Sequence, residues 1–215
     1  MSAPTVLIVA KAPVPGLAKT RLAGHVGEAV AADFAAAALL DTLDAARATG
    51  WPVVVSMTGD LDRAARAEDL RTALADVEVV PQRGTTFAER LVNAHADAAR
   101  GHGVVQVGMD TPQVSAEQLR EAGDLLADHR AVLGHAEDGG WWLLALRDPA
   151  DAAALVDVEM STTHTGADTA AVLPAPLAQV DPARDVDEWQ DAFMVASSYV
   201  QLRAAAVVRE AGGQQ

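Results

Sequence analysis

The sequence has no cysteine, few aromatic residues and far fewer cations than anions. The lack of cysteine excludes disulfides, zinc–thiolate sites and thiol nucleophiles. Aromatic residues make up 4% of the chain while 50% of it is hydrophobic, so Ala, Val and Leu must build the core. The net charge of −14 argues against nucleic acid or an anionic membrane as a partner. Any phosphate ligand would therefore need local cations or a metal ion.

Long apolar runs are also absent, so the sequence offers no candidate for a membrane-spanning helix. No N-terminal segment has the pattern of a signal peptide. We therefore expect a soluble, cytoplasmic protein. The length of 215 residues fits one large domain, which we place at residues 1–207, with a disordered tail at 208–215.

Short apolar runs alternate with helical patterns along the chain. This alternation predicts an α/β fold of three layers (α/β/α) with a mainly parallel, mixed sheet. The polar turn at 137–140 places the following strand antiparallel. The predicted strands are 5–10, 52–57, 77–80, 104–108, 131–134 and 141–146, with a short one at 179–180, and the predicted helices are 28–49, 60–75, 85–100, 115–128, 149–156, one from 167, and 188–212.

The loop after the first predicted strand is the most informative stretch. It contains Pro13, Pro15 and Gly16 and carries three cations, which are Lys11, Lys19 and Arg21. Backbone N–H groups at the following helix start would favour an anion, and the cations would add charge. The pattern indicates a phosphate site, although an ordinary surface loop with solvated cations would look similar. It is not a P-loop, because Gly-x-x-x-x-Gly-Lys-[Ser/Thr] does not occur.

Polar clusters also follow three later strands, where ligands bind in open α/β sheets. Asp110 follows the fourth strand and is a candidate ligand for Mg²⁺, or else a turn residue that caps the next helix. Asp185 and Asp187 are candidates for a second carboxylate, or else N-cap residues of the following helix. The other clusters are Gln82, Arg83 and Gly84 with Glu89 and Arg90, and Glu137, Asp138, Gly139 and Gly140.

Two further patterns limit the chemistry. The six histidines have no His-x-x-x-His spacing, so a histidine metal site is disfavoured. His135 and His164 fall in predicted loops at the cleft, where they would either be solvated, which is favoured, or contact a substrate. No Gly-x-Ser-x-Gly motif occurs, which disfavours a serine hydrolase. Trp141 and Trp142 are neighbours on a strand and must face opposite ways, one into the core and one toward a pocket.

Four motifs in order carry a resemblance to a known family. They are Lys11-x-Pro13-x-Pro15-Gly16-x-x-Lys19-Thr20-Arg21-Leu22, Gly108-x-Asp110-Thr111-Pro112, Glu137-Asp138-Gly139-Gly140 and Asp185-Val186-Asp187. Together they resemble the DUF2064 family of bacterial proteins, which is often labelled glycosyltransferase-like. That family is similar to the molybdenum-cofactor and phospholactate guanylyltransferases of the nucleotide-diphospho-sugar transferase (GT-A) superfamily. The resemblance covers roughly residues 5–190 and implies a GT-A fold.

The resemblance also implies roles for individual residues. Asp110 and Asp187 match the metal ligands, Mg²⁺ or Mn²⁺ being the expected cofactor, and Lys19, Arg21 and Asp110 match catalytic positions. The implied nucleotide-binding residues are Lys11, Pro15, Gly16, Lys19, Thr20, Arg21, Gln82, Gly84 and Arg90. The implied acceptor side is Asp138, Gly139, Gly140 and Trp141. The chain departs from the family pattern at Met109, His135, the Trp141-Trp142 pair and Glu188-Trp189.

The favoured interpretation is a metal-dependent nucleotidyltransferase. It would join a nucleoside triphosphate to a small phosphorylated or carboxylate acceptor and release pyrophosphate. A glycosyltransferase that uses a nucleotide-diphospho-sugar ranks second, because a diphosphate gives less reason for three cations in the first loop. A non-catalytic nucleotide-binding protein is the third interpretation. The sequence does not determine the base, the acceptor or the oligomeric state.

Overall fold

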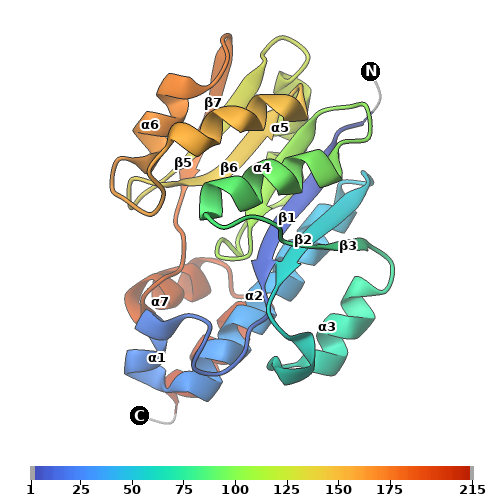
Figure 1. Ribbon diagram of the computed structural model, residues 1–215. Coiled ribbons are helices and arrows are strands. Elements are labelled where there is room, and N and C mark those ends of the chain that lie inside the picture. The colour runs from blue at the N-terminus through green and yellow to red at the C-terminus, as the bar shows by residue number, and fades with distance from the viewer. Residues whose placement is uncertain (1–2, 214–215) are drawn as a thin grey trace.

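In the computed structural model, which describes residues 3–213, seven strands form one sheet in the order β3-β2-β1-β4-β6-β5-β7 (Figure 1). Only β6 runs antiparallel to its neighbours. The predicted mainly parallel, mixed sheet is confirmed, including the reversed strand after the turn at 137–140. The strands are β1 (Thr5–Lys11), β2 (Val53–Thr58), β3 (Glu78–Pro81), β4 (Val104–Gly108), β5 (Ala131–Ala136), β6 (Trp141–Leu146) and β7 (Leu177–Ala183).

Helices cover both faces of the sheet. Val6 and Ile8 of β1 face a core cluster with α2 and α5, whereas Leu7 faces a cluster with α4 on the other side. The helices are α1 (Thr20–Val26), α2 (Glu28–Ala48), α3 (Ala67–Leu74), α4 (Phe87–Ala98), α5 (Ala116–Leu125), α6 (Thr165–Val172), α7 (Trp189–Ser198) and α8 (Arg203–Gly212), with short 3₁₀ helices η1 (Leu61–Arg63) and η2 (Pro149–Asp157). The predicted three-layer arrangement is therefore confirmed.

Local sequence signals account for several helix starts. Thr86 and Glu89 form a capping box at the start of α4, and Ser115 and Gln118 form another at α5. Most of the alanines of α2 are buried, which suits a long helix lying between the sheet and the C-terminal helices. No helix among residues 3–213 is both long and apolar enough to cross a membrane.

The predicted helix at 60–75 is broken in the structure, and this prediction needs correction. η1 and α3 replace it, and between them Arg66 has a left-handed backbone conformation with φ 51°. Its guanidinium binds Asp33 of α2 at 2.6 and 2.8 Å rather than pointing to solvent. This partner on another helix explains why the break is not readable from the local pattern.

The C-terminal part also differs from the predictions. The predicted helix at 188–212 divides into α7 and α8, because Asp41 of α2 accepts hydrogen bonds from the backbone N–H groups of Arg203 and Ala204. α8 continues to Gly212, so the expected tail at 208–215 is corrected: residues 208–212 are helical, and 214–215 lie outside the described residues. That residues 1–207 form one domain stays a prediction.

The strand order sets the position of the candidate site. β1 lies between β2 and β4: the chain runs outward from β1 to β2 and β3, and then crosses back to β4 on the other side of β1. In open α/β sheets such a switch point opens a crevice at the carboxyl ends of the strands. The loop after β1 and the segment after β4 both begin there.

Candidate active site

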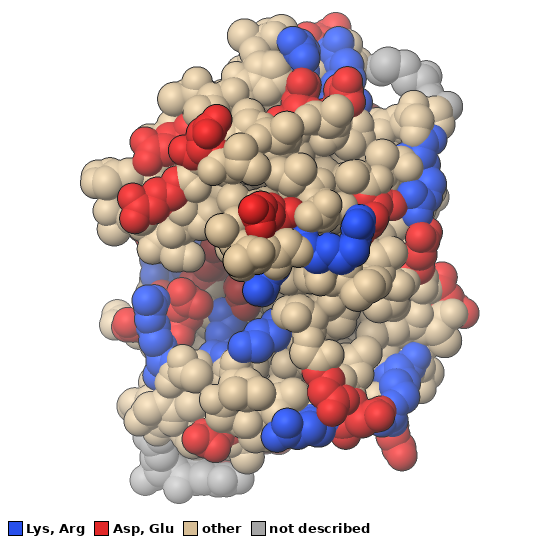
Figure 2. Space-filling view, in the orientation of Figure 1, with Lys and Arg blue, Asp and Glu red and all other residues tan. Residues whose placement is uncertain are grey.

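A cavity of about 770 Å³ lies at the carboxyl ends of β1, β4 and β5. Figure 2 shows it as a hollow in which cationic and anionic side chains lie next to one another. Most of the residues that the sequence assigns to a site line this cavity. They are Lys11, Lys19, Thr20, Arg21, Gln82, Arg90, Asp110, Asp138, Gly140, Trp141 and Asp187, whereas Pro15, Gly16, Gly84 and Gly139 do not line it.

The first loop turns back sharply before it enters α1. Lys11 Nζ donates to the carbonyl of Leu17 at 2.8 Å, which ties the two ends of the loop together. Gly16 has φ 77°, and a Cβ there would also approach the Glu28 carboxylate at 3.1 Å. Lys19, the N-cap of α1, has the left-handed conformation (φ 48°) although it is not glycine. Such strained residues are found preferentially at functional sites.

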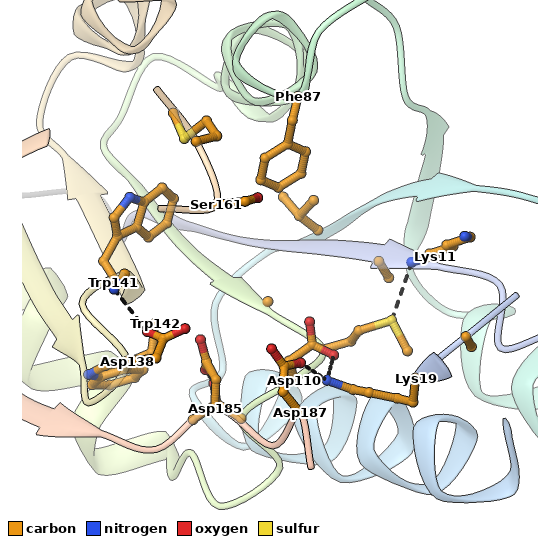
Figure 3. Close-up of a pocket in the computed structure, with 18 of the residues that line it drawn as sticks. Lys11, Lys19, Phe87, Asp110, Asp138, Trp141, Trp142, Ser161, Asp185 and Asp187 are labelled. Atoms are coloured by element: carbon orange, nitrogen blue, oxygen red, sulfur yellow. Dashed lines mark hydrogen bonds and ion pairs between the residues drawn. The ribbon is translucent and has the colours of Figure 1, made fainter. Parts of the chain in front are cut away.

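Lys19 is the centre of the site (Figure 3). Its ammonium lies 2.6 Å from Asp110 Oδ1 and 3.1 Å from Asp187 Oδ1, and Arg21 lies 3.3 Å from the other oxygen of Asp187. Burial by itself lowers the pKa of Lys19, but the two carboxylates outweigh it, so its pKa lies above the ordinary value. The loop after β1 is thereby joined to two segments far along the chain.

Both aspartates have roles other than helix capping. The N-cap of α5 is Ser115 and that of α7 is Glu188, so neither Asp110 nor Asp187 fills those positions. The backbone carbonyl of Asp110 accepts from Val186 N at 2.9 Å, which holds the segment after β7 against the end of β4. This bond explains why Asp187 reaches Lys19.

Asp185 is a third carboxylate in the cleft. Thr111 donates its hydroxyl hydrogen to the carboxylate of Asp185. Burial raises the pKa of Asp185 to about 6, the Thr111 bond opposes this, and the nearby charge of Asp110 adds to it. Asp185 was one of the two candidates for the second carboxylate, and the structure brings both of them into the cleft.

The residues after β3, from Gln82 to Arg90, are positioned mainly by contacts with the backbone. Gln82 donates its amide to the carbonyls of Ala10 and Ser56 at 2.9 and 3.0 Å, so its NH₂ group secures the strand ends. Gly84 has φ 131°, and a Cβ there would lie 2.9 Å from the backbone nitrogen of Arg90. This glycine therefore lets the chain pass closely over the start of α4.

The acceptor side expected from the sequence lies across the cleft from Lys11. Asp138 Oδ1 accepts from Gly140 N at 2.8 Å, which closes the turn and directs the carboxylate into the cavity. Trp142 is buried in the core with its Nε1 donating to the carbonyl of Asp181, and the half-buried Trp141 is the more exposed of the two. The predicted core position of one tryptophan is confirmed, although both contribute atoms to the cavity wall.

Sequence reasoning missed two parts of the cavity wall. One is Phe87 at the start of α4, and the other is the segment Met160, Ser161, Thr162 and Thr163 before α6. The segment has no hydrophobic period, so only its density of hydroxyl residues could have drawn attention to it. Neither His135 nor His164 lines the cavity.

A divalent cation in this cleft would require oxygen ligands that converge on one point. Among residues 3–213, no three His, Cys, Asp or Glu side chains lie close enough to hold a metal by themselves. Asp110 and Asp187 nevertheless converge on one positive charge, the Lys19 ammonium. Mg²⁺ commonly takes one or two carboxylates and completes its shell with phosphate oxygens and water. The residues present fit such a cation.

Comparison with known proteins assigns the family. Residues 40–162 match the family described as an uncharacterised protein conserved in bacteria (DUF2064). No curated protein matches the sequence of the chain.

Solved structures share the fold at low identity. A Desulfovibrio desulfuricans protein, provisionally described as a nucleotide-diphospho-sugar transferase, is 24% identical with a TM-score of 0.85, over 99% of this chain and 96% of that one. A Methanothermobacter nucleotidyl transferase is 18% identical with a TM-score of 0.60, over 93% and 99%. Rv0371c of Mycobacterium tuberculosis, solved in complex with manganese, is 22% identical with a TM-score of 0.57, over 92% and 100%. The likeness confirms the predicted fold.

Proposed function

The chain belongs to the DUF2064 family, and on that premise we propose that it is a metal-dependent nucleotidyltransferase. It would join a nucleoside triphosphate to a small acceptor and release pyrophosphate. The observation that carries the proposal is the meeting of Lys19 with Asp110 and Asp187 inside the cleft. A cationic loop at a helix start, beside paired carboxylates, is what a triphosphate with a divalent cation requires.

The triphosphate would lie along the loop after β1. Lys11, Lys19 and Arg21 supply three positive charges there, and the backbone N–H groups at the start of α1 add donors. Pro15 and Gly16 shape the loop, and Thr20 lies at the first turn of α1. Gln82 and Arg90 also line the cavity, and Gly84 lets the chain pass closely over the start of α4 between them; there we place the nucleoside.

Asp110 and Asp187 would hold Mg²⁺ or Mn²⁺. When bound, the cation supplies positive charge against the negative charge that develops on the transferred phosphoryl group. The structure of Rv0371c, which was solved in complex with manganese, supports the binding of a divalent cation on this fold.

The reaction would proceed by direct displacement. An oxygen of the acceptor forms a bond to the α-phosphorus, and the bond from that phosphorus to the pyrophosphate oxygen breaks. Lys11, Lys19 and Arg21 would bind the leaving pyrophosphate, and Lys19 also holds Asp110 and Asp187 in place. Catalysis would come from positioning and fixed charge, without a covalent intermediate on the protein.

The neighbouring nucleotide-diphospho-sugar transferase supports a second candidate, which is glycosyl transfer from a nucleotide sugar. Product analysis separates the two. The protein would be incubated with Mg²⁺, a deproteinised extract of bacterial metabolites, and in turn each nucleoside triphosphate or nucleotide sugar. Release of pyrophosphate supports nucleotidyl transfer. Release of a nucleoside diphosphate contradicts it in favour of glycosyl transfer, and nucleotide binding without any turnover indicates a non-catalytic binding protein.

A further inference from the structure

The wall of the cleft formed by Trp141 and residues 160–163 has no role in the nucleotide site described above. Figure 3 shows the Trp141 indole and Ser161 on one side of the cavity, with Asp138 and Asp185 on the other. The space between them adjoins Asp110 and Asp187, where transfer would occur. A second substrate placed there would reach the reacting phosphorus.

The segment that carries Ser161 is firmly held. Thr165 Oγ1 donates to the carbonyl of Glu159 at 2.9 Å and accepts from Thr162 N at 3.0 Å. Gly166 N donates to the carbonyl of Gly139 at 2.8 Å, which fastens the segment to the turn at 137–140. Ser161 itself has φ 64°, a conformation that costs free energy for a residue with a side chain. This wall is therefore a preformed surface.

The wall formed by Trp141 and residues 160–163 has no charged side chain and is rich in hydroxyl groups. Within residues 3–213 the hydroxyls of Ser161 and Thr163 make no hydrogen bond to the protein, so both can bind a ligand. The Trp141 indole offers a broad apolar face that can cover a ring.

The charges of this half are negative. Asp138 and Asp185 face the space, whereas the lining cations Lys19 and Arg21 are paired with Asp110 and Asp187 and are assigned to the triphosphate. Beyond them, Arg184 is held by Glu137 and Asp191. The lining cations without a carboxylate partner among the described residues, Lys11 and Arg90, belong to the nucleotide half. An anionic acceptor would meet uncompensated like charge.

We propose that Trp141 and residues 160–163 form an acceptor subsite, and that it takes a neutral, hydroxyl-bearing ring of the size of a hexose. The proposal rests on the proposed function and narrows it, replacing the phosphorylated or carboxylate acceptor expected from the sequence. Carboxylate oxygens of Asp138 and Asp185 accept hydrogen bonds from ring hydroxyls, Ser161 and Thr163 offer further partners, and one face of the ring lies on Trp141. A hydroxyl oxygen bonds to the α-phosphorus, its proton leaves to solvent, and pyrophosphate departs.

The test uses four ligands that share one ring and differ in charge. Glucose, glucose 6-phosphate, glucuronate and glucosamine are titrated at millimolar concentrations against the full chain with Mg²⁺ and a non-hydrolysable nucleoside triphosphate, and binding is followed by saturation-transfer NMR and calorimetry. Glucose is expected to bind at least about tenfold more tightly than either anionic sugar. Saturation transfer should be strongest at ring protons of one face.

Three variants sharpen the result. Trp141→Leu should weaken glucose about tenfold, whereas Phe193→Ala, which removes an exposed aromatic ring on α7 outside the cleft, should not. Asp138→Asn keeps the oxygen that accepts from Gly140 but removes the charge, so it should reduce the discrimination against glucuronate about threefold or more.

Each other outcome overturns the inference. If either anionic sugar binds more tightly than glucose, the acceptor is anionic. If glucosamine binds more tightly than glucose, the acceptor is cationic. If none of the four binds, a hexose-like ring is excluded. Nucleotide binding is measured separately in the same samples. If the nucleotide binds and the sugars do not, the acceptor subsite is wrong while the proposed function stands.

Discussion

The ammonium of Lys19 lies 2.6 Å from the Asp110 carboxylate, and this contact joins the loop after β1 to the end of β4. The Lys19 side chain is 7% exposed, so the charge is largely withdrawn from water. A buried ammonium is retained where its charge has a specific use, because its desolvation is costly. In the proposed reaction that use is to bind the triphosphate and to hold both aspartates.

Replacement of this ammonium tests its role directly. Lys19→Met keeps most of the side-chain volume and removes the charge, so we expect transfer to slow by on the order of 10²–10³. Arg71→Met serves as the control, because Arg71 makes an exposed ion pair with Asp62 away from the cleft. The steady-state rate of transfer is measured for both variants and for the wild type. Equal rates for Lys19→Met and the wild type would exclude Lys19 from the machinery.

The two aspartates are expected to bind the divalent cation. Asp110→Asn and Asp187→Asn keep the side-chain shape but remove one negative charge each, so each should weaken Mn²⁺ binding by about tenfold or more. Paramagnetic resonance of Mn²⁺ with the nucleotide present measures the free and bound ion. Asp62 lies on the surface near α3, so the control variant Asp62→Asn should leave the affinity for Mn²⁺ unchanged. If neither cleft variant alters Mn²⁺ affinity, the metal ligands lie elsewhere.

Gly139 tests how tightly the turn at 137–140 is packed. Its φ is 95°, and a Cβ there would overlap the carbonyl oxygen of Thr163, whereas a Cβ at Gly50 (φ 78°) meets no atom within 4 Å. Both alanine variants bear the strain of a positive φ, about 1–2 kcal/mol. Gly139→Ala should cost about 1–3 kcal/mol more than Gly50→Ala, because backbone must also move. Urea unfolding measures the difference, and equal losses would show that the turn is loosely packed.

His95 gives the fold a dependence on pH. It is fully buried on α4, its Nε2 lies 2.8 Å from Gln106 Oε1, and burial lowers its pKa to about 4. The unfolded chain therefore binds the proton more readily, and stability is lost as the pH falls from the ordinary value near 6.5 toward 4. Between pH 7 and 5 the loss from this group should be about 2 kcal/mol.

The measurement compares urea unfolding of the wild type and His95→Gln across this range. The glutamine does not titrate and can still donate to Gln106, so the difference between the two curves isolates the histidine. That difference should shrink as the pH falls. A constant difference would mean that the pKa of His95 is the same in the folded and the unfolded chain, which contradicts the lowered value.

Much of the fold was predictable because the strands are buried on both faces. Runs such as Val6, Leu7 and Ile8 are apolar without interruption, which is typical of parallel strands. The carboxyl ends of β1 and β4 bring the Lys19 loop and Asp110 together, as the strand pattern predicts. The choice of Asp187 over Asp185 came only from the family resemblance, and its contact with Lys19 depends on the bond from Val186 N to the carbonyl of Asp110.

Other features depend on partners that are distant in the chain. The break at Arg66 follows from Asp33 on another helix, and the separation of α8 from α7 follows from Asp41. The acceptor wall around Ser161 has no periodic pattern, and its conformation is set by Thr165 and Gly166. Local propensity carries no signal for such contacts, so these parts required the structure.

The central claim is that the cleft binds a nucleoside triphosphate together with a divalent cation through Lys19. Calorimetric titration of the wild type with each nucleoside triphosphate, with and without Mg²⁺, tests it most directly, with Lys19→Met measured in parallel. We predict that at least one triphosphate binds the wild type tightly, and only when Mg²⁺ is present. The Lys19→Met variant should bind that triphosphate about 100-fold more weakly. Failure of every triphosphate to bind, or equal binding by Lys19→Met, would contradict the account.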